Sequence, residues 1–431
     1  MSYKFKLSGQ NQLFILLILL IITAFGSSVL AAAPTIMEDH FQNKEIENVE
    51  IRAEAGAEIR LPEKLEVEFK SGIRAEFPVD WELNGDLSYQ EKGNYQLEGK
   101  IIIKDYPNPL IEQRADPFIY KHQDGYYYFT ASYPAYDRII MRRAKTISGL
   151  KEAEEKIIWW KHPDKEMSKH IWAPEIHFID GKWYIYFAAA RIDAIWAIRQ
   201  YVLENESVNP LEGEWTEKGK IKMNFEEFTL DATSFTHQNQ RYLVWAQKKY
   251  GNSNLYLAEL KTPWEIEGRQ KLIAEPIHSW ERKGFNVNEG AAVIKKGDKI
   301  FISYSASATD SNYTVGLLTA DQDDNLLNPD SWSKYGAPIF KSSELTEEYG
   351  PGHNSFTVDE NGNDILVYHS RAYKEIDGDP LYDPNRHTRV QRIFWDQNDN
   401  PVFGIPGYEI LGDKDVTAEI IIDYKIDGFK D

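Results

Sequence analysis

Three acidic residues in this chain each open a short apolar segment. Asp116 precedes Pro-Phe-Ile-Tyr, Asp231 precedes Ala-Thr-Ser-Phe, and Glu289 precedes Gly-Ala-Ala-Val. An unpaired carboxylate at the start of a buried strand is costly unless it faces a solvated cleft. A single such acid is readily explained as a strand-end residue that binds backbone groups, whereas three acids at matched points favour one shared site.

Three carboxylates in one partly dry cleft suit acid–base chemistry. Like charges raise the pKa of at least one member, so one carboxyl stays protonated as an acid while another remains ionised as a base. Cleavage of a glycosidic bond requires these two states, and a wide separation leaves room for water to attack the anomeric carbon directly. The three acids therefore predict a glycoside hydrolase that inverts the anomeric configuration.

The elements that must position these acids recur along the chain. A turn followed by an aromatic-rich strand occurs five times, at a period of roughly 55 to 65 residues. Several strands per repeat, without a long amphipathic helix, predict an all-β fold, a five-bladed β-propeller, with a pair of β-sandwiches as the alternative. The turn pairs, whose Gly, Asn or Asp suit tight hairpins, are Asp124-Gly125, Asp180-Gly181, Asn239-Gln240, Gly297-Asp298 and Gly362-Asn363.

The register of the repeats places further residues beside the acids. In a propeller the first strand of every blade runs along the central axis, so matched positions face one another across the channel mouth. Counting back about eight residues from each turn leads, with one residue of slippage in the last repeat, to Asp116, Trp172, Asp231, Glu289 and His353.

The N-terminal part of the chain has a different pattern. Lys4 and Lys6 precede an apolar run and then Ala31-Ala32-Ala33, which predicts a signal peptide over residues 1–33. An uncleaved membrane anchor is the alternative, although the run is shorter than the ~20 residues of a spanning helix. We therefore expect a secreted bacterial protein, extracellular or periplasmic, that is not inserted in the membrane after signal cleavage.

Residues 40–105 show alternating apolar and polar strands and predict a small immunoglobulin-like β-sandwich. Pro78-Val79-Asp80-Trp81 and Gly93-Asn94-Tyr95 resemble bacterial immunoglobulin-like domains, and a spacer or packing role is favoured over a binding one. Two prolines, Pro107 and Pro109, then interrupt strand pairing, so the propeller is expected over residues 107–431.

Composition narrows the class of partner. The net charge of −19 argues against nucleic acid and acidic surfaces, because binding either relies on a positive field. The chain has no cysteine, so core burial alone must stabilise the fold. Twelve Trp, 25 Tyr and 20 Phe could stack on sugars, although most aromatics in a β-rich protein fill the core.

Five short motifs, in order, resemble those of glycoside hydrolase family 43, five-bladed propeller enzymes that act mainly on arabinose- and xylose-containing polymers. The resemblance spans residues 107 to 412. It implies that Asp116 is the general base, that Glu289 is the general acid, and that Asp231 orients the acid and raises its pKa. The motifs are Arg114-Ala-Asp116-Pro-Phe, Trp172-Ala-Pro-Glu175-Ile-His, Leu230-Asp231-Ala, Asn288-Glu289-Gly-Ala and Gly350-Pro-Gly-His353-Asn-Ser.

Further residues follow from the same resemblance. Trp172 would stack on the sugar, and Arg371 or Arg389 could donate to its hydroxyls, an ordinary ion pair being equally compatible with either arginine. The resemblance implies a structural calcium that His353 contacts directly or through water. A lone neutral imidazole without a cluster of acidic ligands is, however, a poor site for this hard cation, and no cofactor is expected to be required.

The late run Asp383-Pro-Asn-Arg386-His-Thr-Arg389 most resembles the α-L-arabinofuranosidases. We therefore expect release of terminal α-L-arabinofuranosyl residues from plant cell-wall polysaccharides or oligosaccharides, with β-xylosidase or another arabinan- or xylan-degrading activity as the alternative. A non-catalytic glycan-binding propeller is a further alternative. Retaining fructan hydrolases share the architecture, but their Asn-Asp-Pro-Asn-type run does not occur here.

Overall fold

The computed structural model describes residues 49–82, 91–101, 106–408 and 414–423. The predicted signal peptide, residues 1–33, lies outside them. Within these ranges the fold is all-β, with three short 3-10 helices and no α-helix, as the sequence predicted. No helix in the described part is long and apolar enough to cross a membrane. The 3-10 helices are η2 (Ser148–Leu150), η3 (Ser279–Glu281) and η4 (Pro329–Ser331).

Five antiparallel sheets make up the larger part of the molecule, and each takes its strands from one continuous stretch of sequence. The first sheet is β5 (Ala115–Lys121), β6 (Tyr127–Ser132), β7 (Arg138–Ala144) and β8 (Lys156–Trp160). The second is β9 (Lys169–Ile179), β10 (Lys182–Arg191), β11 (Ala194–Asn205) and β12 (Thr216–Lys220). The third is β13 (Thr229–His237), β14 (Gln240–Lys249), β15 (Asn252–Thr262) and β16 (Glu265–Ala274).

The fourth and fifth sheets complete the set. The fourth is β17 (Asn288–Lys296), β18 (Lys299–Ala306), β19 (Thr314–Asp321) and β20 (Ser333–Lys334), and the fifth is β21 (Tyr349–Val358), β22 (Asp364–Arg371) and β23 (His387–Arg392). All five predicted turn pairs lie at the connection between the first and second strand of a sheet, which confirms the repeat that was inferred from the sequence.

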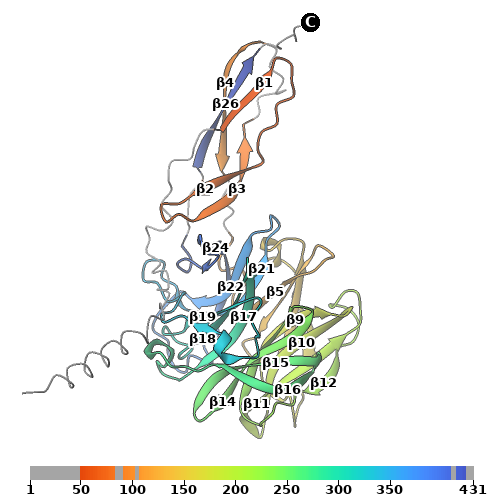
Figure 1. The fold of residues 1–431 in the computed structure, drawn as a ribbon. Coiled ribbons are helices and arrows are strands. Elements are labelled where there is room, and N and C mark those ends of the chain that lie inside the picture. The colour runs from red at the N-terminus through yellow and green to blue at the C-terminus, as the bar shows by residue number, and fades with distance from the viewer. Residues whose placement is uncertain (1–48, 83–90, 102–105, 409–413, 424–431) are drawn as a thin grey trace, which may run out of the picture.

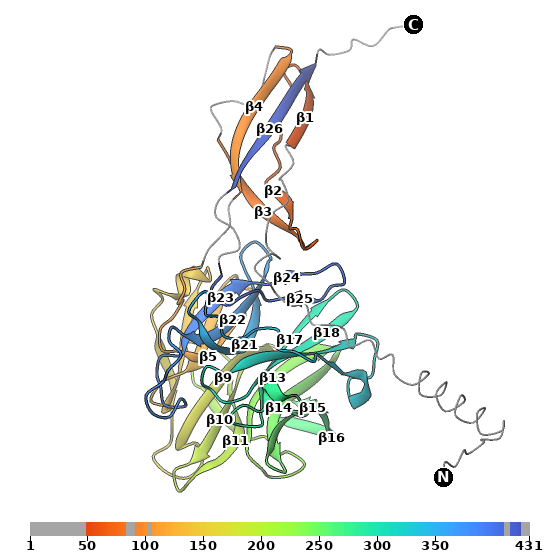
Figure 2. The ribbon, with the colours of Figure 1, turned by 90° about the vertical axis from the view of Figure 1, so that its left-hand side faces the viewer.

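The first strands of the five sheets pack on one another in sequence. β5 contacts β9, β9 contacts β13, β13 contacts β17, and β17 contacts β21. β21 in turn contacts β5, so the five sheets form a closed ring. Aromatic side chains fill the space between neighbouring sheets, as where the Tyr128 and Trp183 rings lie 4.8 Å apart. Figures 1 and 2 show the ring as the rounded lower body of the molecule.

A slender module stands on the ring (Figures 1 and 2). Its sheet has the order β1-β26-β4-β3-β2, and β3 pairs with β2 along most of its length and with β4 at its end. The strands are β1 (Val49–Glu54), β2 (Lys64–Glu68), β3 (Arg74–Trp81), β4 (Gly93–Ile101) and β26 (Lys414–Asp423).

The C-terminal strand corrects the predicted domain boundary. The repeat domain was expected to run from residue 107 to 431, but β26 lies between β1 and β4 in the N-terminal module. Its apolar residues Val416, Ala418, Ile420 and Ile422 are buried there, at alternate positions of the strand. This period-2 pattern identifies a strand with one buried face, but it does not show to which sheet the strand belongs.

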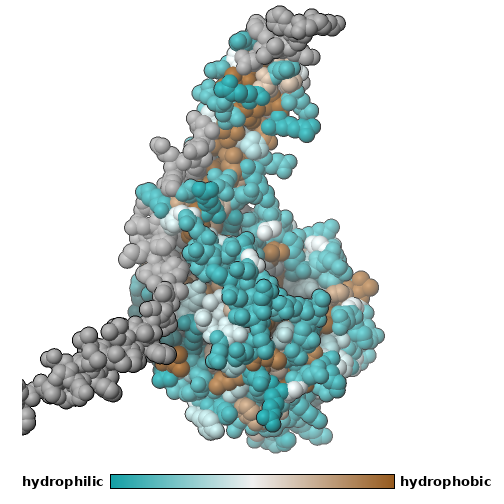
Figure 3. Space-filling view, viewed as in Figure 1, coloured by the Kyte–Doolittle hydropathy of each residue, from teal (hydrophilic) through white to brown (hydrophobic). Residues whose placement is uncertain are grey.

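A short two-stranded sheet, β24 (Phe394–Trp395) and β25 (Pro401–Val402), joins the module to the ring. Phe394 and Val402 belong to the same buried cluster as Phe69 and Phe77 of the module. The Phe394 ring lies 5.9 Å from that of Phe69 in an edge-on contact. Figure 3 shows mainly hydrophilic residues on the visible face of the ring, and more hydrophobic residues along the module.

Candidate active site

Each of the five first strands has at least one shift in its pairing register, and the candidate residues lie at or beside these shifts. The pairing register shifts after Ala115 in β5, after Leu230 in β13 and after Glu289 in β17, and β9 and β21 have comparable shifts. A β-bulge of this kind bends the strand and redirects a side chain. The residues with positive φ at these points are Asp116, Ala173, Asp231, Gly290 and His353, with φ of 54°, 44°, 55°, 56° and 42°.

The positions with positive φ differ by one residue from the predicted equivalent positions in the second and fourth sheets. Asp116, Asp231 and His353 themselves adopt the left-handed conformation, whereas Trp172 and Glu289 directly precede the residue that does. Gly290 suits its position for two reasons: its φ is positive, and a Cβ there would lie 3.2 Å from Cγ of His353. The other four positions are non-glycine residues with positive φ, and such strained backbone around one cavity is typical of a functional site.

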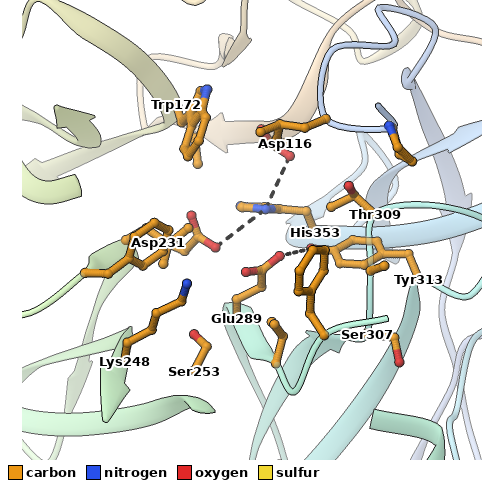
Figure 4. Close-up of a pocket in the computed structure, with 18 of the residues that line it drawn as sticks. Asp116, Trp172, Asp231, Lys248, Ser253, Glu289, Ser307, Thr309, Tyr313 and His353 are labelled. Atoms are coloured by element: carbon orange, nitrogen blue, oxygen red, sulfur yellow. Dashed lines mark hydrogen bonds and ion pairs between the residues drawn. The ribbon is translucent and has the colours of Figure 1, made fainter. Parts of the chain in front are cut away.

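The five bulges surround one cavity of about 450 Å³, a size typical of small-molecule sites. All five sheets line it (Figure 4). The predicted residues that it brings together are Asp116, Trp172, Asp231, Glu289 and His353.

Asp116 lies in a dense network of donors. Its Oδ2 accepts a hydrogen bond of 2.6 Å from the Ser132 hydroxyl. Its Oδ1 lies 3.3 Å from both His353 Nδ1 and Arg386 Nη1. Burial alone would raise the pKa of Asp116, but the charges of His353 and Arg386 outweigh it and hold this pKa well below the usual value. Asp116 is therefore an ionised carboxylate, suited to accept a proton.

Two histidines flank Asp116 and differ in protonation state. The backbone N–H of Asp116 donates to His369 Nδ1 at 3.0 Å, so this nitrogen carries no proton. Burial lowers the pKa of His369 well below its usual value, and the Arg386 charge adds to the effect. Burial also acts to lower the pKa of His353, but the carboxylates of Asp116, Asp231 and Glu289 prevail and raise it. His369 is thus neutral, whereas His353 favours the charged form between the acids.

Asp231 and Glu289 have the opposite tendency to Asp116. Burial, with the nearby negative charges of Glu289 and Asp116, raises the pKa of Asp231 to about 8 against the opposing effect of His353. Burial likewise raises the pKa of Glu289, against the opposing effects of His353 and a hydrogen bond from Tyr313. At neutral pH this pair of carboxyls retains a proton, so the cavity contains both an ionised base and a protonated acid.

Hydrogen bonds fix the two acids relative to each other. The backbone N–H of Gly290, which follows Glu289, donates to Asp231 Oδ2 at 3.0 Å. The Tyr313 hydroxyl donates to Glu289 Oε1 at 2.9 Å (Figure 4). Burial and the neighbouring carboxylates raise the pKa of Tyr313 well above its usual value, so the hydroxyl remains a donor. Asp231 therefore holds the backbone that presents Glu289.

Trp172 forms one wall of the cavity. Its ring stacks on His170 at 4.3 Å and meets Tyr136 edge-on at 5.6 Å. Its buried Nε1 has no hydrogen-bond partner among the described residues. The ring position suits stacking on a sugar face, as predicted, and the indole N–H is an additional donor.

The predicted arginines lie elsewhere, and a third arginine occupies the cavity. Arg389 forms a buried ion pair of 2.9 Å with Glu348, and Arg371 donates to the carbonyls of Thr309 and Pro380. Neither lines the cavity. Arg386 does, and it donates to Asp116 Oδ1 at 3.3 Å and to the Tyr136 hydroxyl at 2.9 Å. Arg371 also forms an ion pair of 3.5 Å with Asp383, so the ion-pair alternative fits both predicted arginines.

Sequence reasoning missed Arg386, Tyr313, Tyr136 and His369, because none of them lies on a repeat position. Arg386 was within the quoted run Asp383-Pro-Asn-Arg386, where the proline and asparagine indicate a loop. A loop arginine beside a strand start is a better candidate for a cavity than a strand arginine such as Arg389. Tyr313 directly precedes β19 and offered no comparable signal.

The residues around His353 do not fit a calcium ion. Its Nδ1 faces the carboxylates of Asp116 and Asp231, at 3.3 and 3.9 Å, in a setting that favours the charged imidazolium. A lone imidazole nitrogen is a poor ligand for calcium, which prefers six to eight oxygen ligands. The described part of the chain contains no group of three or more acidic or histidine side chains arranged for a metal.

The cavity is surrounded by five sheets and contains both an ionised and a protonated carboxyl. This pair of carboxyls is characteristic of the glycoside hydrolases. Residues 106–401 match the model of glycosyl hydrolases family 43, and the chain belongs to this family. Residues 46–104 match the bacterial Ig-like domain, group 4.

Curated relatives carry more specific names. The chain is 56% identical over 305 residues to the extracellular exo-alpha-(1->5)-L-arabinofuranosidase of Streptomyces avermitilis, covering 70% of this chain and 63% of the relative. It is 54% identical over 307 residues to alpha-L-arabinofuranosidase 43 of Humicola insolens, covering 70% and 64%. The chain thus spans less than two thirds of the length of these relatives.

One solved structure aligns with this chain over almost its whole length. The alpha-L-arabinofuranosidase of Lactobacillus brevis is 51% identical and superposes with a TM-score of 0.69, over 71% of this chain and 99% of that one. The residues that match the family model, 106–401, include the ring of sheets from β5 to β23.

Proposed function

We propose that this protein is a secreted, inverting, exo-acting α-L-arabinofuranosidase that releases terminal arabinose from arabinose-containing polysaccharides or oligosaccharides. The observation that carries the proposal is the division of protonation within one cavity: Asp116 is held ionised, while the Asp231–Glu289 pair retains a proton. The names of the similar proteins supply the sugar and, for the Streptomyces relatives, the extracellular site and the exo mode.

The proposed reaction is a single displacement. Asp116 takes a proton from water as the water oxygen bonds to the anomeric carbon, and Glu289 gives its proton to the leaving oxygen as the glycosidic bond breaks. Solvent then removes the proton from Asp116 and restores that of Glu289. Asp231 forms with Glu289 the coupled pair that keeps a proton, and it positions Glu289 through the Gly290 N–H.

The remaining cavity residues have supporting parts in this proposal. Arg386 and His353 hold Asp116 ionised, and the second donor of Arg386 binds the Tyr136 hydroxyl. Trp172 provides an apolar face for the sugar ring. His353 is placed as an electrostatic residue between the acids rather than as a calcium ligand.

The architecture that supports this chemistry is proposed to be a five-bladed β-propeller with the five sheets as blades. The support is the closed ring of contacts between β5, β9, β13, β17 and β21. The likeness to the Lactobacillus brevis structure is consistent with it.

Two substitutions test the division of labour. Glu289→Gln is expected to lower kcat/KM on an aryl arabinofuranoside with a poor leaving group by about 10²- to 10⁴-fold, and much less with dinitrophenolate, which leaves without a proton. Asp116→Asn is expected to lower kcat/KM equally with both leaving groups. Steady-state kinetics with the two aryl arabinofuranosides gives the comparison, and Asp124→Asn, on a hairpin outside the cavity, is the control.

Four results would contradict the proposal. Unchanged turnover in Glu289→Gln removes this residue from the chemistry. A retained anomer in the first-formed product, seen by NMR, excludes single displacement. Cleavage of an aryl β-xyloside in preference to the arabinofuranoside selects the xylosidase alternative, and binding of arabino-oligosaccharides without hydrolysis selects the glycan-binding one.

A further inference from the structure

A buried ion pair lies outside the cavity, in the same sheet as Glu289. Glu281, the last residue of η3, is fully buried, and its Oε1 forms an ion pair with Nζ of Lys334 in β20. The Lys334 side chain is itself only 12% exposed. Neither residue lines the cavity, so neither can contact the substrate there. Because taking two charges out of water is costly, a buried ion pair is weak evidence of a purely stabilising role.

The ion pair binds both ends of the side chain of Asn288, the residue directly before Glu289. Asn288 is fully buried, and its Nδ2 donates to Glu281 Oε1 at 2.8 Å and to the Val287 carbonyl at 2.9 Å. Its Oδ1 accepts from Lys334 Nζ at 2.9 Å. A carboxylate can only accept and an ammonium can only donate, so the two charges allow the amide one orientation.

Further groups hold Glu281 in place. Its Oε2 accepts from the His278 N–H at 2.7 Å, and its Oε1 accepts from the Tyr304 hydroxyl at 3.0 Å. Burial and the Glu281 charge raise the pKa of Tyr304 well above its usual value, so this hydroxyl remains a donor. The Lys334 ammonium lies 4.9 Å from the centre of the Tyr304 ring. Groups from η3, β17, β18 and β20 thus converge on one carboxylate and form a fully connected polar network.

The backbone at Glu289 is restrained by a side chain on each side of it. After Glu289, the Gly290 N–H donates to Asp231 Oδ2, and before it, Asn288 is bound by the ion pair. The register of β17 shifts between Glu289 and Ala292, so regular strand pairing does not define the backbone at this point. Misplacement of a reacting group by about 1 Å can cost about 100-fold in rate. Both restraints therefore matter for where the Glu289 carboxyl lies.

We propose that Glu281 and Lys334 are positioning residues for the reaction. Acting through Asn288, the pair fixes the backbone that presents Glu289 to the glycosidic oxygen. The inference rests on the proposed function, because it takes Glu289 as the general acid. It leads to a kinetic signature that general stabilisation would not give, since a misplaced acid slows only those reactions whose leaving group needs a proton.

The test compares Glu281→Gln with the wild type on phenyl and dinitrophenyl α-L-arabinofuranoside. The substituted amide has one accepting oxygen where the carboxylate has two, so it cannot keep the contacts with both the His278 N–H and Asn288 Nδ2. We expect kcat/KM for the phenyl glycoside to fall about 10- to 100-fold, mainly through kcat. For the dinitrophenyl glycoside, whose leaving group needs no proton, kcat/KM should change less than about threefold.

Glu348→Gln is the matched control, because Glu348 is also buried and binds a cation, a tyrosine hydroxyl and a further hydroxyl, all within the fifth sheet. It should lower Tm without a kinetic loss that depends on the leaving group. A single substitution leaves the other charge of a pair buried and unpaired, so Glu281→Gln combined with Lys334→Met is the second test. The double variant should regain much of the Tm lost in Glu281→Gln but keep the selective kinetic loss, because Asn288 Oδ1 then lacks its donor.

Every other outcome counts against the positioning role. An equal loss with both leaving groups, or no loss with either, overturns it, as does the same selective loss in Glu348→Gln. Recovery of both Tm and phenyl-glycoside turnover in the double variant would trace the kinetic loss to instability and overturn it too. The proposed function fails separately: unchanged phenyl-glycoside turnover in Glu289→Gln removes the acid itself, and a wild type that hydrolyses neither glycoside refutes the function and this inference with it.

Discussion

The two ends of the ring of sheets are built by opposite means. At the mouth, Asp116, Asp231 and Glu289 are buried within one cavity together with His353 and Arg386. At the other end, where the module stands, the buried groups are apolar, with Phe394 and Val402 of the ring side packed on Phe69 and Phe77 of the module. The mouth holds buried charge, whereas the junction holds buried hydrocarbon.

The positions of these two regions follow from the direction of the first strands. Asp116 and His353 lie before the hairpin turns of β5 and β21, toward the mouth. The module contacts the turn that follows β21, where Lys64 Nζ donates to the Asn361 carbonyl at 3.4 Å. Arg392 Nη1 donates to the Glu76 carbonyl at 3.0 Å nearby. The module therefore meets the ring away from the cavity, which supports the predicted packing role over a role in binding substrate.

The junction and the mouth differ in what they contribute, the junction to stability and the mouth to the proposed activity. Buried apolar contacts at the junction contribute stability. Asp231 and Glu289 at the mouth cost stability, because the unfolded chain ionises them more readily than the folded protein does, and the proposed acid–base chemistry accounts for their presence. Substitutions at the junction should thus lower stability without lowering activity. Substitutions at the mouth should lower activity without lowering stability.

The largest change in stability is expected at the junction. Phe394→Ala removes a buried ring that contacts Phe69 and Phe77, and should lower the free energy of unfolding by about 3 to 5 kcal/mol. Differential scanning calorimetry measures the effect, and kcat/KM at 25 °C should remain within twofold. Leu97→Ala is the comparison, because Leu97 belongs to a separate buried cluster of the module that does not include Phe394. It shows the effect of destabilising the module itself, as distinct from weakening its contact with the ring. A loss of activity in folded Phe394→Ala would contradict the separation.

The sequence was informative about the mouth and less so about the junction. Turn residues and strand starts repeat with the sheets, so the positions of Asp116, Asp231 and Glu289 could be located by register. Arg386 and Tyr313 could not, because they come from connections between strands and reach the cavity only through tertiary packing. Comparing the repeats locates residues at equivalent positions of the strands. Residues in the connecting loops have no equivalent positions and cannot be located in this way.

The junction was not predictable for a related reason. β26 and β1 are separated by more than 350 residues, and nothing local indicates that they pair in parallel. The alternation of buried residues in β26 identified a strand but not its sheet. Likewise, the bulge that shifts Glu289 by one position relative to Asp116 is a backbone feature, which residue spacing alone did not distinguish.

A smaller, pH-dependent change is expected when Asp231 is replaced. Its pKa is about 8 in the folded protein, above the usual 3.8, so between these values the unfolded state releases a proton that the folded state keeps. Stability of the wild type therefore falls as pH rises through this window, by up to about 1.4 kcal/mol per pH unit. Asp231→Asn lacks this loss while its amide oxygen can still accept from Gly290 N–H, so the variant should be more stable by a few kcal/mol at pH 8, though less active.

Urea unfolding at pH 4, 6 and 8 measures the gap between Asp231→Asn and the wild type, which should widen with pH. Asp124→Asn gives the opposite sign: hydrogen bonds from Tyr128 and Tyr126 N–H lower the pKa of Asp124 against the effect of burial, so this carboxylate stabilises the fold at neutral pH. A gap for Asp231→Asn that stays constant over this range would show that the carboxyl does not retain its proton in the folded protein.

The smallest effect is expected for a change that preserves charge within the mouth. Arg386→Lys keeps a cation near Asp116 but loses the fork that reaches both Asp116 and the Tyr136 hydroxyl, so kcat/KM should fall about tenfold while the acid limb of its pH profile stays in place. Arg389→Lys is the matched control, because Arg389 pairs with Glu348 outside the cavity and its replacement should alter stability rather than kcat/KM. Equal kinetic losses in the two variants would mean that Arg386 acts through general packing. A loss confined to Arg386→Lys would establish that the mouth depends on the geometry of its charges as well as on their sign, which is the feature that most distinguishes it from the apolar junction.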